Sequence, residues 1–194
     1  MSADRTRTLR VVGLDLSLTS TGMSDGFVSR ATQTGKDNPI ESRLKYIRSS
    51  VGRFVSGQDP ERPWADLVVI EAGAFSRNLQ TGHEELAALR YLIRVLMTEY
   101  YIPFAMVPPT TLKAYTAGHG KATKSEMVTA LYERHGVDLS GVKVKDGRYD
   151  IADATALAAM GYEWLGEPLP TAGPPPPRKS LVAVQWPAVG AGAE

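Results

Sequence analysis

Four carboxylates occupy positions where stability alone would not place them. Asp15 lies inside the apolar run LRVVGLDL, and Glu71 directly follows the apolar run LVVI. Asp150 and Asp153 are three residues apart at the start of the last predicted helix. Burying several acids together costs free energy that a cation offsets, and all-oxygen ligands suit Mg²⁺ or Mn²⁺. Two such ions activate a water and stabilise the leaving oxygen in phosphodiester hydrolysis.

The acids also have a purely structural interpretation. Asp150 and Asp153 would favour the positive end of a helix dipole without binding anything. A mid-strand aspartate such as Asp15 has no comparable explanation, because its apolar neighbours indicate a buried strand. Asp15 is therefore the residue that most strongly suggests chemistry.

Cations accompany these acids. The capping box Thr123–Glu126 predicts the start of a helix, and Lys124 lies in its first turn. A cation there meets the positive end of the helix dipole. That placement indicates an anionic partner, although an ordinary solvated lysine is the alternative. The net charge of the chain is only +1, yet residues 105–148 hold seven Lys and Arg against four Asp and Glu. We expect this stretch, with Lys121 at its periphery, to contact phosphates.

Hydrophobic periodicity and turn residues predict the elements that must position these side chains. Alternating apolar residues broken by glycines predict three strands in a meander over residues 9–33. Short apolar runs predict further strands at 67–70 and 104–107, the second ended by Pro108 and Pro109. Periodicity of 3.6 residues predicts helices over 41–55, 82–100, 124–135 and 149–165.

Composition suggests one domain within the 194 residues. We expect an N-terminal arm at 1–8, a domain at 9–165 and a proline-rich tail at 166–194 that does not fold. Deleting the tail should leave the fold intact, unless its apolar patch LVAVQW packs back as a strand. Otherwise that patch is a candidate docking peptide for a partner.

Several classes of protein are excluded by composition. The chain has no cysteine, so disulfide scaffolds, zinc–cysteine sites, iron–sulfur clusters and thiol catalysis do not apply. No apolar run approaches the roughly 20 residues of a membrane span, and the N-terminus lacks the apolar region of a secretory signal. We expect a cytoplasmic protein with no membrane partner.

Three motifs together resemble the RuvC family of Holliday-junction resolvases in the RNase H-like superfamily. They are GLDLSLTSTG around Asp15, VVIEAG around Glu71 and DIADATALA around Asp150 and Asp153, in that order. The resemblance covers residues 9–165. It implies an α/β, RNase H-like fold: a mixed five-stranded sheet, with a three-strand antiparallel meander plus two parallel strands, flanked by helices. It also implies a bacterial or phage-encoded protein.

The same resemblance implies the activity and the role of each residue. In that family these acids bind two Mg²⁺ ions, which Mn²⁺ can replace: Asp15 would bridge both ions, Glu71 would hold one, and Asp150 and Asp153 would complete the other. The expected reaction is paired cleavage of four-way junctions or flaps, leaving 5′-phosphate and 3′-hydroxyl ends. Two lysines near the family's active site correspond to Lys113 and Lys124. An aromatic residue that stacks on junction bases corresponds approximately to Phe75, with core packing as the alternative.

Two other functions compete with this interpretation. The segment 13–22 resembles the phosphate-binding hairpin of actin-like ATP-binding proteins, although those proteins use two domains and this chain is short for them. A non-catalytic nucleic-acid-binding module of the same fold is the other alternative. The presence of all four acids argues against it.

The long helix over 82–100 predicts a homodimer. One arc of this helix is apolar enough to face the core. A second strip, formed by Ala88, Tyr91, Leu92 and Val95, is also apolar and would be exposed to solvent in a monomer. A two-fold dimer through this strip would present two identical sites to the two strands of a junction. Cover by a loop or by the tail is the alternative.

Overall fold

The computed structural model describes residues 8–57, 63–73, 82–170 and 178–188. Five strands form one sheet in the order β3-β2-β1-β4-β5. The bounds are β1 Val11–Asp15, β2 Ser20–Ser24, β3 Ser29–Gln33, β4 Leu67–Glu71 and β5 Phe104–Val107. β1, β2 and β3 pair antiparallel, whereas β4 pairs parallel with both β1 and β5. The predicted meander and mixed five-stranded sheet are confirmed.

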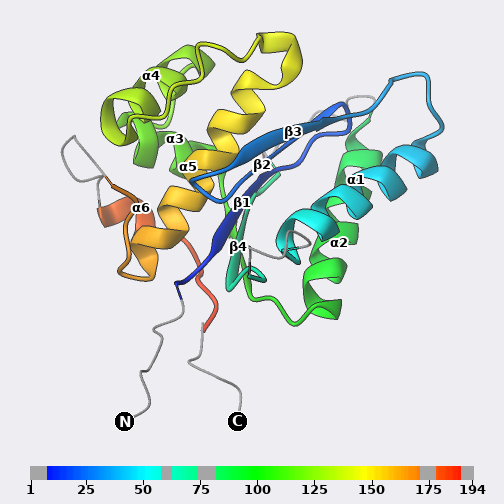
Figure 1. The fold of residues 1–194 in the computed structure, drawn as a ribbon, viewed down its shortest axis with the longest axis horizontal. Coiled ribbons are helices and arrows are strands. Elements are labelled where there is room, and N and C mark those ends of the chain that lie inside the picture. Colours follow the sequence, from blue (N-terminus) through cyan, green and yellow to red (C-terminus); the bar gives the residue numbers. More distant parts are fainter. Residues whose placement is uncertain (1–7, 58–62, 74–81, 171–177, 189–194) are drawn as a thin grey trace.

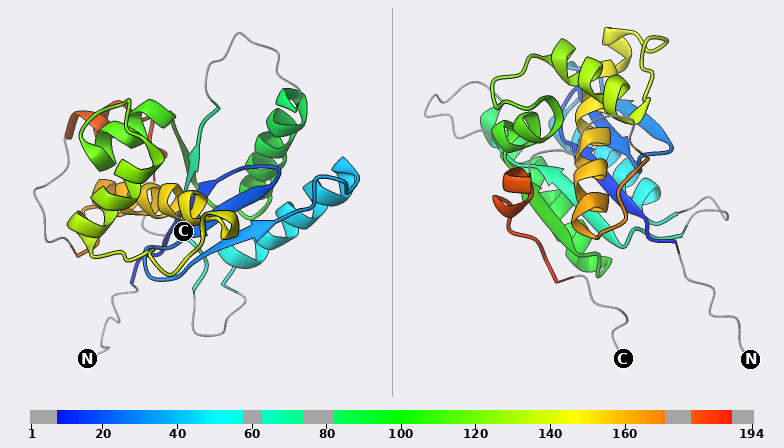
Figure 2. Two further views of the ribbon diagram at one scale, coloured as in Figure 1. Left: turned by 90° about the horizontal axis from the view of Figure 1, so that it is seen from above. Right: turned by 90° about the vertical axis from the view of Figure 1, so that its left-hand side faces the viewer.

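Helices cover both faces of this sheet (Figures 1 and 2). One face packs on α1 (Ile40–Val55) and α2 (His83–Glu99), and the other on α3 (Pro109–Ala117), α4 (Lys124–His135) and α5 (Arg148–Trp164). Successive residues of the central strands alternate between the two cores, so that Val68 and Ile70 face α2 while Leu67 and Val69 face α5. The continuous apolar runs of β1 and β4 follow from burial on both faces.

The predicted ends of α4 are confirmed in detail. Thr123 Oγ1 accepts a hydrogen bond from the Glu126 backbone N–H, and the Glu126 carboxylate accepts one from the Thr123 N–H. Gly136 ends the helix with a φ of 66°, in the left-handed region that glycine adopts without steric cost. The capping box therefore fixes the backbone of Lys124, the first residue of α4.

Two segments differ from what the sequence predicts. Pro108 and Pro109 end β5 as expected, but they also begin α3, because proline fits the first turn of a helix, where its missing N–H is not needed. The segment after α5, predicted to stay unfolded, includes the short helix α6 (Arg178–Val182). Three of its apolar side chains are buried in the core beside α3 and α5: Leu169, Leu181 and Val184. The LVAVQW patch thus packs back as one alternative predicts, but without forming a strand, since Leu181 and Val182 end helix α6 and the next residues form a turn and a loop.

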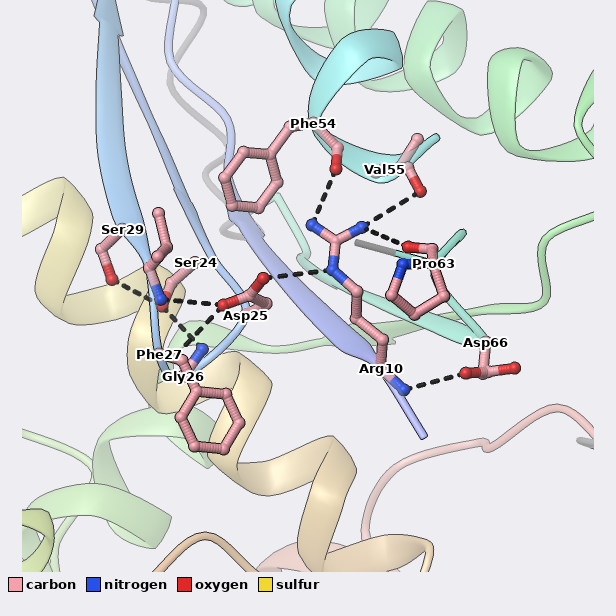
Figure 3. Close-up of polar contacts among 11 residues, drawn as sticks. Arg10, Ser24, Asp25, Gly26, Phe27, Ser29, Phe54, Val55, Pro63 and Asp66 are labelled. Carbon is pink, nitrogen blue, oxygen red and sulfur yellow. Dashed lines mark hydrogen bonds and ion pairs between the residues drawn. The ribbon is translucent and has the colours of Figure 1, made fainter. Parts of the chain in front are cut away.

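A buried ion pair fixes the start of β1, at the opposite end of the strand from Asp15 (Figure 3). Arg10 Nε donates to Asp25 Oδ2 at 3.1 Å, and both residues are about 95% shielded from solvent, with exposed fractions of 5% and 4%. The remaining guanidinium nitrogens donate to the backbone carbonyls of Phe54, Val55 and Pro63. These contacts join the β2–β3 turn, the end of α1 and the approach to β4.

None of the helices within the described residues has the length and hydropathy that a membrane span requires.

Candidate active site

The carboxyl ends of β1 and β4 bring two of the predicted acids together. The two strands are parallel, and Leu14 pairs with Ile70, so the next residues, Asp15 and Glu71, emerge at the same edge of the sheet. The two carboxyl groups lie close enough for each to shift the pKa of the other. Asp15 is 8% exposed, which is a strongly buried position for a carboxylate.

Helix α5 delivers the other two acids to this edge, because two glycines let it lie directly on the sheet. A Cβ at Gly13 of β1 would come 2.0 Å from the Ala154 carbonyl oxygen, and one at Gly22 of β2 would come 2.0 Å from the Asp150 carbonyl oxygen. Gly22 pairs with Asp15 across the two strands. The first turns of α5, with Asp150 and Asp153, therefore lie over the strand end that carries Asp15.

The mutual repulsion of these acids shows in their proton affinities. Burial raises the pKa of Asp15 well above its usual range, and the negative charges of Glu71, Asp153 and Asp150 raise it further. The interaction between the two carboxyl groups raises the pKa of Asp15 further and lowers that of Glu71. Burial also raises the pKa of Asp153 to about 7, with Glu71 as the next cause. The raised pKa values of Asp15 and Asp153 indicate an excess of negative charge at this site.

Asp150 lies at the edge of this group. Its Oδ2 accepts a hydrogen bond from the Ser20 hydroxyl on β2. Among the charges that raise the pKa of Asp15, that of Asp150 is the weakest. Within residues 8–57, 63–73, 82–170 and 178–188, no three His, Asp or Glu side chains are arranged to hold a metal ion as they stand.

Two predicted lysines lie beside the acids. Lys113 on α3 and Lys124 on α4 both lower the pKa values of Glu71 and Asp153, which burial raises. Lys121 lies in the turn between these helices, where it is exposed and is not among the cations acting on the acids. Phe75 lies outside the described residues.

Arg90 on α2 is a further cation that the sequence interpretation missed. Its charge lowers the pKa of Glu71, and burial lowers the pKa of its own guanidinium. A Cβ at Gly73 would come 2.9 Å from Arg90 Nη1, so the guanidinium lies against the backbone just after β4. One signal for Arg90 is present in the sequence. Arg90 lies three and seven residues before the core residues Ile93 and Met97, so its charge is on the buried face of the helix.

The chain therefore has an α/β fold with a mixed five-stranded sheet, and an acidic group at the carboxyl ends of its central parallel strands. No protein-family model matches the chain, and no curated protein matches it in sequence. Solved structures do match its fold. Thermus thermophilus RuvC aligns with a TM-score of 0.61 and 20% identity, over 84% of this chain and 99% of that one.

The same protein in complex with a Holliday junction substrate aligns with a TM-score of 0.61 and 21% identity, again over 84% of this chain and 99% of that one. The yeast mitochondrial Holliday junction resolvase Ydc2 aligns with a TM-score of 0.51 and 16% identity, over 82% of this chain and 80% of that one. These similarities confirm the RNase H-like fold found in RuvC.

Proposed function

We propose that this protein is a metal-dependent endonuclease that resolves Holliday junctions or other branched DNA. The observation that carries the proposal is the acidic group formed by Asp15, Glu71 and Asp153, with Asp150 at its edge, on a fold shared with RuvC. The structural relatives include a RuvC solved with a Holliday junction and a yeast enzyme named as a junction resolvase.

The donor set fits a hard divalent cation. All four side chains offer carboxylate oxygens, the ligands that Mg²⁺ prefers and that Mn²⁺ also accepts. The raised pKa values of Asp15 and Asp153 mark a surplus of negative charge that a cation would neutralise. We expect two ions per site, held by Asp15, Glu71, Asp150 and Asp153. When bound, they supply the activation of a water and the stabilisation of the leaving oxygen.

The protein's own cations then act on the DNA. Lys113 and Lys124 face the acids from α3 and α4, so a phosphate placed over the acidic group would meet both ammonium groups. A charge fixed beside the scissile phosphate stabilises the negative charge that develops there during hydrolysis. Lys121 is proposed to contact a more peripheral phosphate, and Phe75, four residues after Glu71 in the sequence, to stack on junction bases. The expected products carry 5′-phosphate and 3′-hydroxyl ends.

A homodimer would supply the second cut. On α2, Tyr91 is 63% exposed and Val95 is 52% exposed, while the opposite side of the helix is buried in the core. Within the described residues, Ala88, Tyr91 and Val95 of the strip are thus exposed and Leu92 is half-buried, which leaves an apolar surface open to an isologous interface. Binding of a partner protein by the segment 166–194, and a cytoplasmic location, stay predictions.

The test is incubation of the protein with labelled four-way, flap and duplex DNA, with and without Mg²⁺. We expect Mg²⁺-dependent paired cuts in the four-way junction and little cutting of duplex DNA. Asp15→Asn should bind the junction without cutting it, because it removes a ligand charge and leaves the lysines in place. Binding of the junction without any cutting in Mg²⁺ or Mn²⁺ would instead favour a non-catalytic binding module. Binding of ATP, measured by calorimetry, would favour the actin-like alternative.

A further inference from the structure

The ammonium group of Lys124 rests on an aromatic ring. Lys124 Nζ lies 5.4 Å from the centroid of the Tyr149 ring, within the range of a cation–π interaction. The two residues come from different helices, since Lys124 is the first residue of α4 and Tyr149 the second residue of α5. Tyr149 directly precedes Asp150, so one turn of α5 presents both an acid and the ring that contacts the cation.

Lys124 needs such a contact to stay in place. Its side chain is exposed and flexible, and the positive end of the α4 dipole repels its charge. Glu126, the nearest acid in sequence, is occupied by the capping box, where its carboxylate accepts hydrogen bonds from the Thr123 backbone N–H and hydroxyl. The electron-rich face of Tyr149 attracts a cation without competing for the acids.

From this position the ammonium charge reaches the acidic group. Lys124 lowers the pKa values of both Glu71 on β4 and Asp153 on α5. Asp153 lies four residues after Tyr149, about one helical turn along the same face of α5. The ring of Tyr149 therefore holds the ammonium beside the turn of α5 that carries Asp153.

We propose that Tyr149 is a positioning residue, whose ring holds the Lys124 ammonium where the scissile phosphate approaches the acidic group. The proposal rests on the proposed nuclease function and deepens it, because it assigns the placement of the cation to a residue outside the acids and lysines. Tyr149 acts through Lys124 alone. Its aromatic face, and not its hydroxyl group, carries the effect.

The kinetic test is a double-mutant cycle in single-turnover cleavage of a four-way junction with saturating Mg²⁺. Tyr149→Phe should cleave as the unaltered protein does, because it keeps the ring. Tyr149→Leu should slow the cleavage step about twofold to fivefold, with unchanged junction affinity, as loss of an exposed cation–π contact predicts. In a Lys124→Ala background, Tyr149→Leu should cause no further slowing.

The matched control is Tyr132→Leu, which removes an exposed tyrosine from α4 whose ring makes no cation–π contact with a lysine in the part of the chain that the structure describes. It should leave the rate unchanged. An equal loss from Tyr149→Leu in both backgrounds would overturn the proposal, since a merely structural effect of the ring does not depend on Lys124.

A second measurement needs no nuclease activity. The chain contains eight lysines. Reductive methylation adds ¹³C-labelled methyl groups to their Nζ atoms and keeps the positive charge. In NMR spectra the Lys124 signal, assigned by its loss in Lys124→Ala, should be shifted upfield by the ring in the unaltered protein and in Tyr149→Phe. It should move to the position of solvated lysines in Tyr149→Leu. An unshifted signal in the unaltered protein would refute the contact, whether or not the protein cleaves DNA.

Discussion

Asp15, which we propose as a metal ligand, lowers the stability of the folded protein. Its carboxyl group is buried beside other acids, so its pKa is raised and the free energy of unfolding falls as pH rises from the unfolded pKa toward the folded one. Asp15→Asn removes this cost with an uncharged side chain of nearly the same size. Without metal at pH 8 we expect Asp15→Asn to be about 1–2 kcal/mol more stable, or roughly 2–8 °C in thermal midpoint.

Thermal unfolding in EDTA measures this difference in stability, and the same measurement in Mg²⁺ tests whether Asp15 is needed for metal binding. Mg²⁺ should stabilise the unaltered protein by binding its native state, and should have little effect on Asp15→Asn. If Asp15→Asn proved less stable than the unaltered protein in EDTA, the buried charge would not be the cost we infer.

Two lysines a few residues apart should behave differently. Lys124 acts on the acids, so Lys124→Ala should slow cleavage by about 10²-fold with little loss of junction binding. Lys121 is exposed in the α3–α4 turn. Lys121→Ala should therefore reduce the slope of log binding constant against log salt concentration by about 1 in magnitude, without slowing cleavage. Single-turnover rates and binding titrations at several salt concentrations separate the two effects. Equal and negligible effects would make both lysines ordinary surface residues.

At the scale of the elements, the contact of α5 with the sheet decides where its acids lie. Gly22→Ala would place a methyl group 2.0 Å from the Asp150 carbonyl oxygen, and backbone atoms at that distance cannot yield without moving the helix. We expect a loss of about 1–3 kcal/mol in unfolding free energy, as overpacking predicts, and a larger fractional loss of cleavage than of junction binding.

Gly141→Ala is the matched control for Gly22→Ala, because a Cβ at Gly141 meets no atom within 4 Å. It should be close to neutral in both stability and cleavage. A fully active Gly22→Ala protein would show that the acids do not depend on the close approach of α5.

The elements also show what a sequence pattern can and cannot predict. The capping box of α4 and the apolar runs of β1 and β4 are local signals, and the structure confirms them. Helix α3 is not predicted by the sequence, because Pro108 and Pro109 are as typical of the end of a strand as of the first turn of a helix. The partners of Asp15 could be anticipated by resemblance, whereas Arg90 and the Ser20–Asp150 hydrogen bond depend on helix placement, which periodicity does not give.

For the whole molecule, the described parts of the C-terminal segment, residues 166–170 and 178–188, pack against the domain. Its removal would expose the core surface that Leu169, Leu181 and Val184 cover, and would break the hydrogen bond between His135 Nδ1 and the Pro170 carbonyl. After the entropy of ordering the segment is subtracted, we expect truncation after residue 165 to cost about 2–5 kcal/mol. Denaturant unfolding of the truncated protein measures this loss. An unchanged midpoint would restore the original prediction of an independent tail.

The oligomeric state is a second property of the whole molecule. Val95→Lys places a charge on the exposed strip of α2 and should convert a dimer into monomers that nick a junction once. Because Val95 is half exposed, the fold should tolerate the change. Light scattering gives the mass of both proteins. A protein that remains monomeric at high micromolar concentration without the substitution would refute the interface.

The indole rings of Trp164 and Trp186 stack with centroids 5.2 Å apart and an interplanar angle of 9°. Transition dipoles held this close couple as an exciton, so the pair should give a bisignate band in far-ultraviolet circular dichroism. One ring belongs to α5 and the other to the C-terminal segment, which makes the band a built-in optical reporter of their association. The release of that segment during unfolding can thus be followed without a label, separately from the melting of the helices.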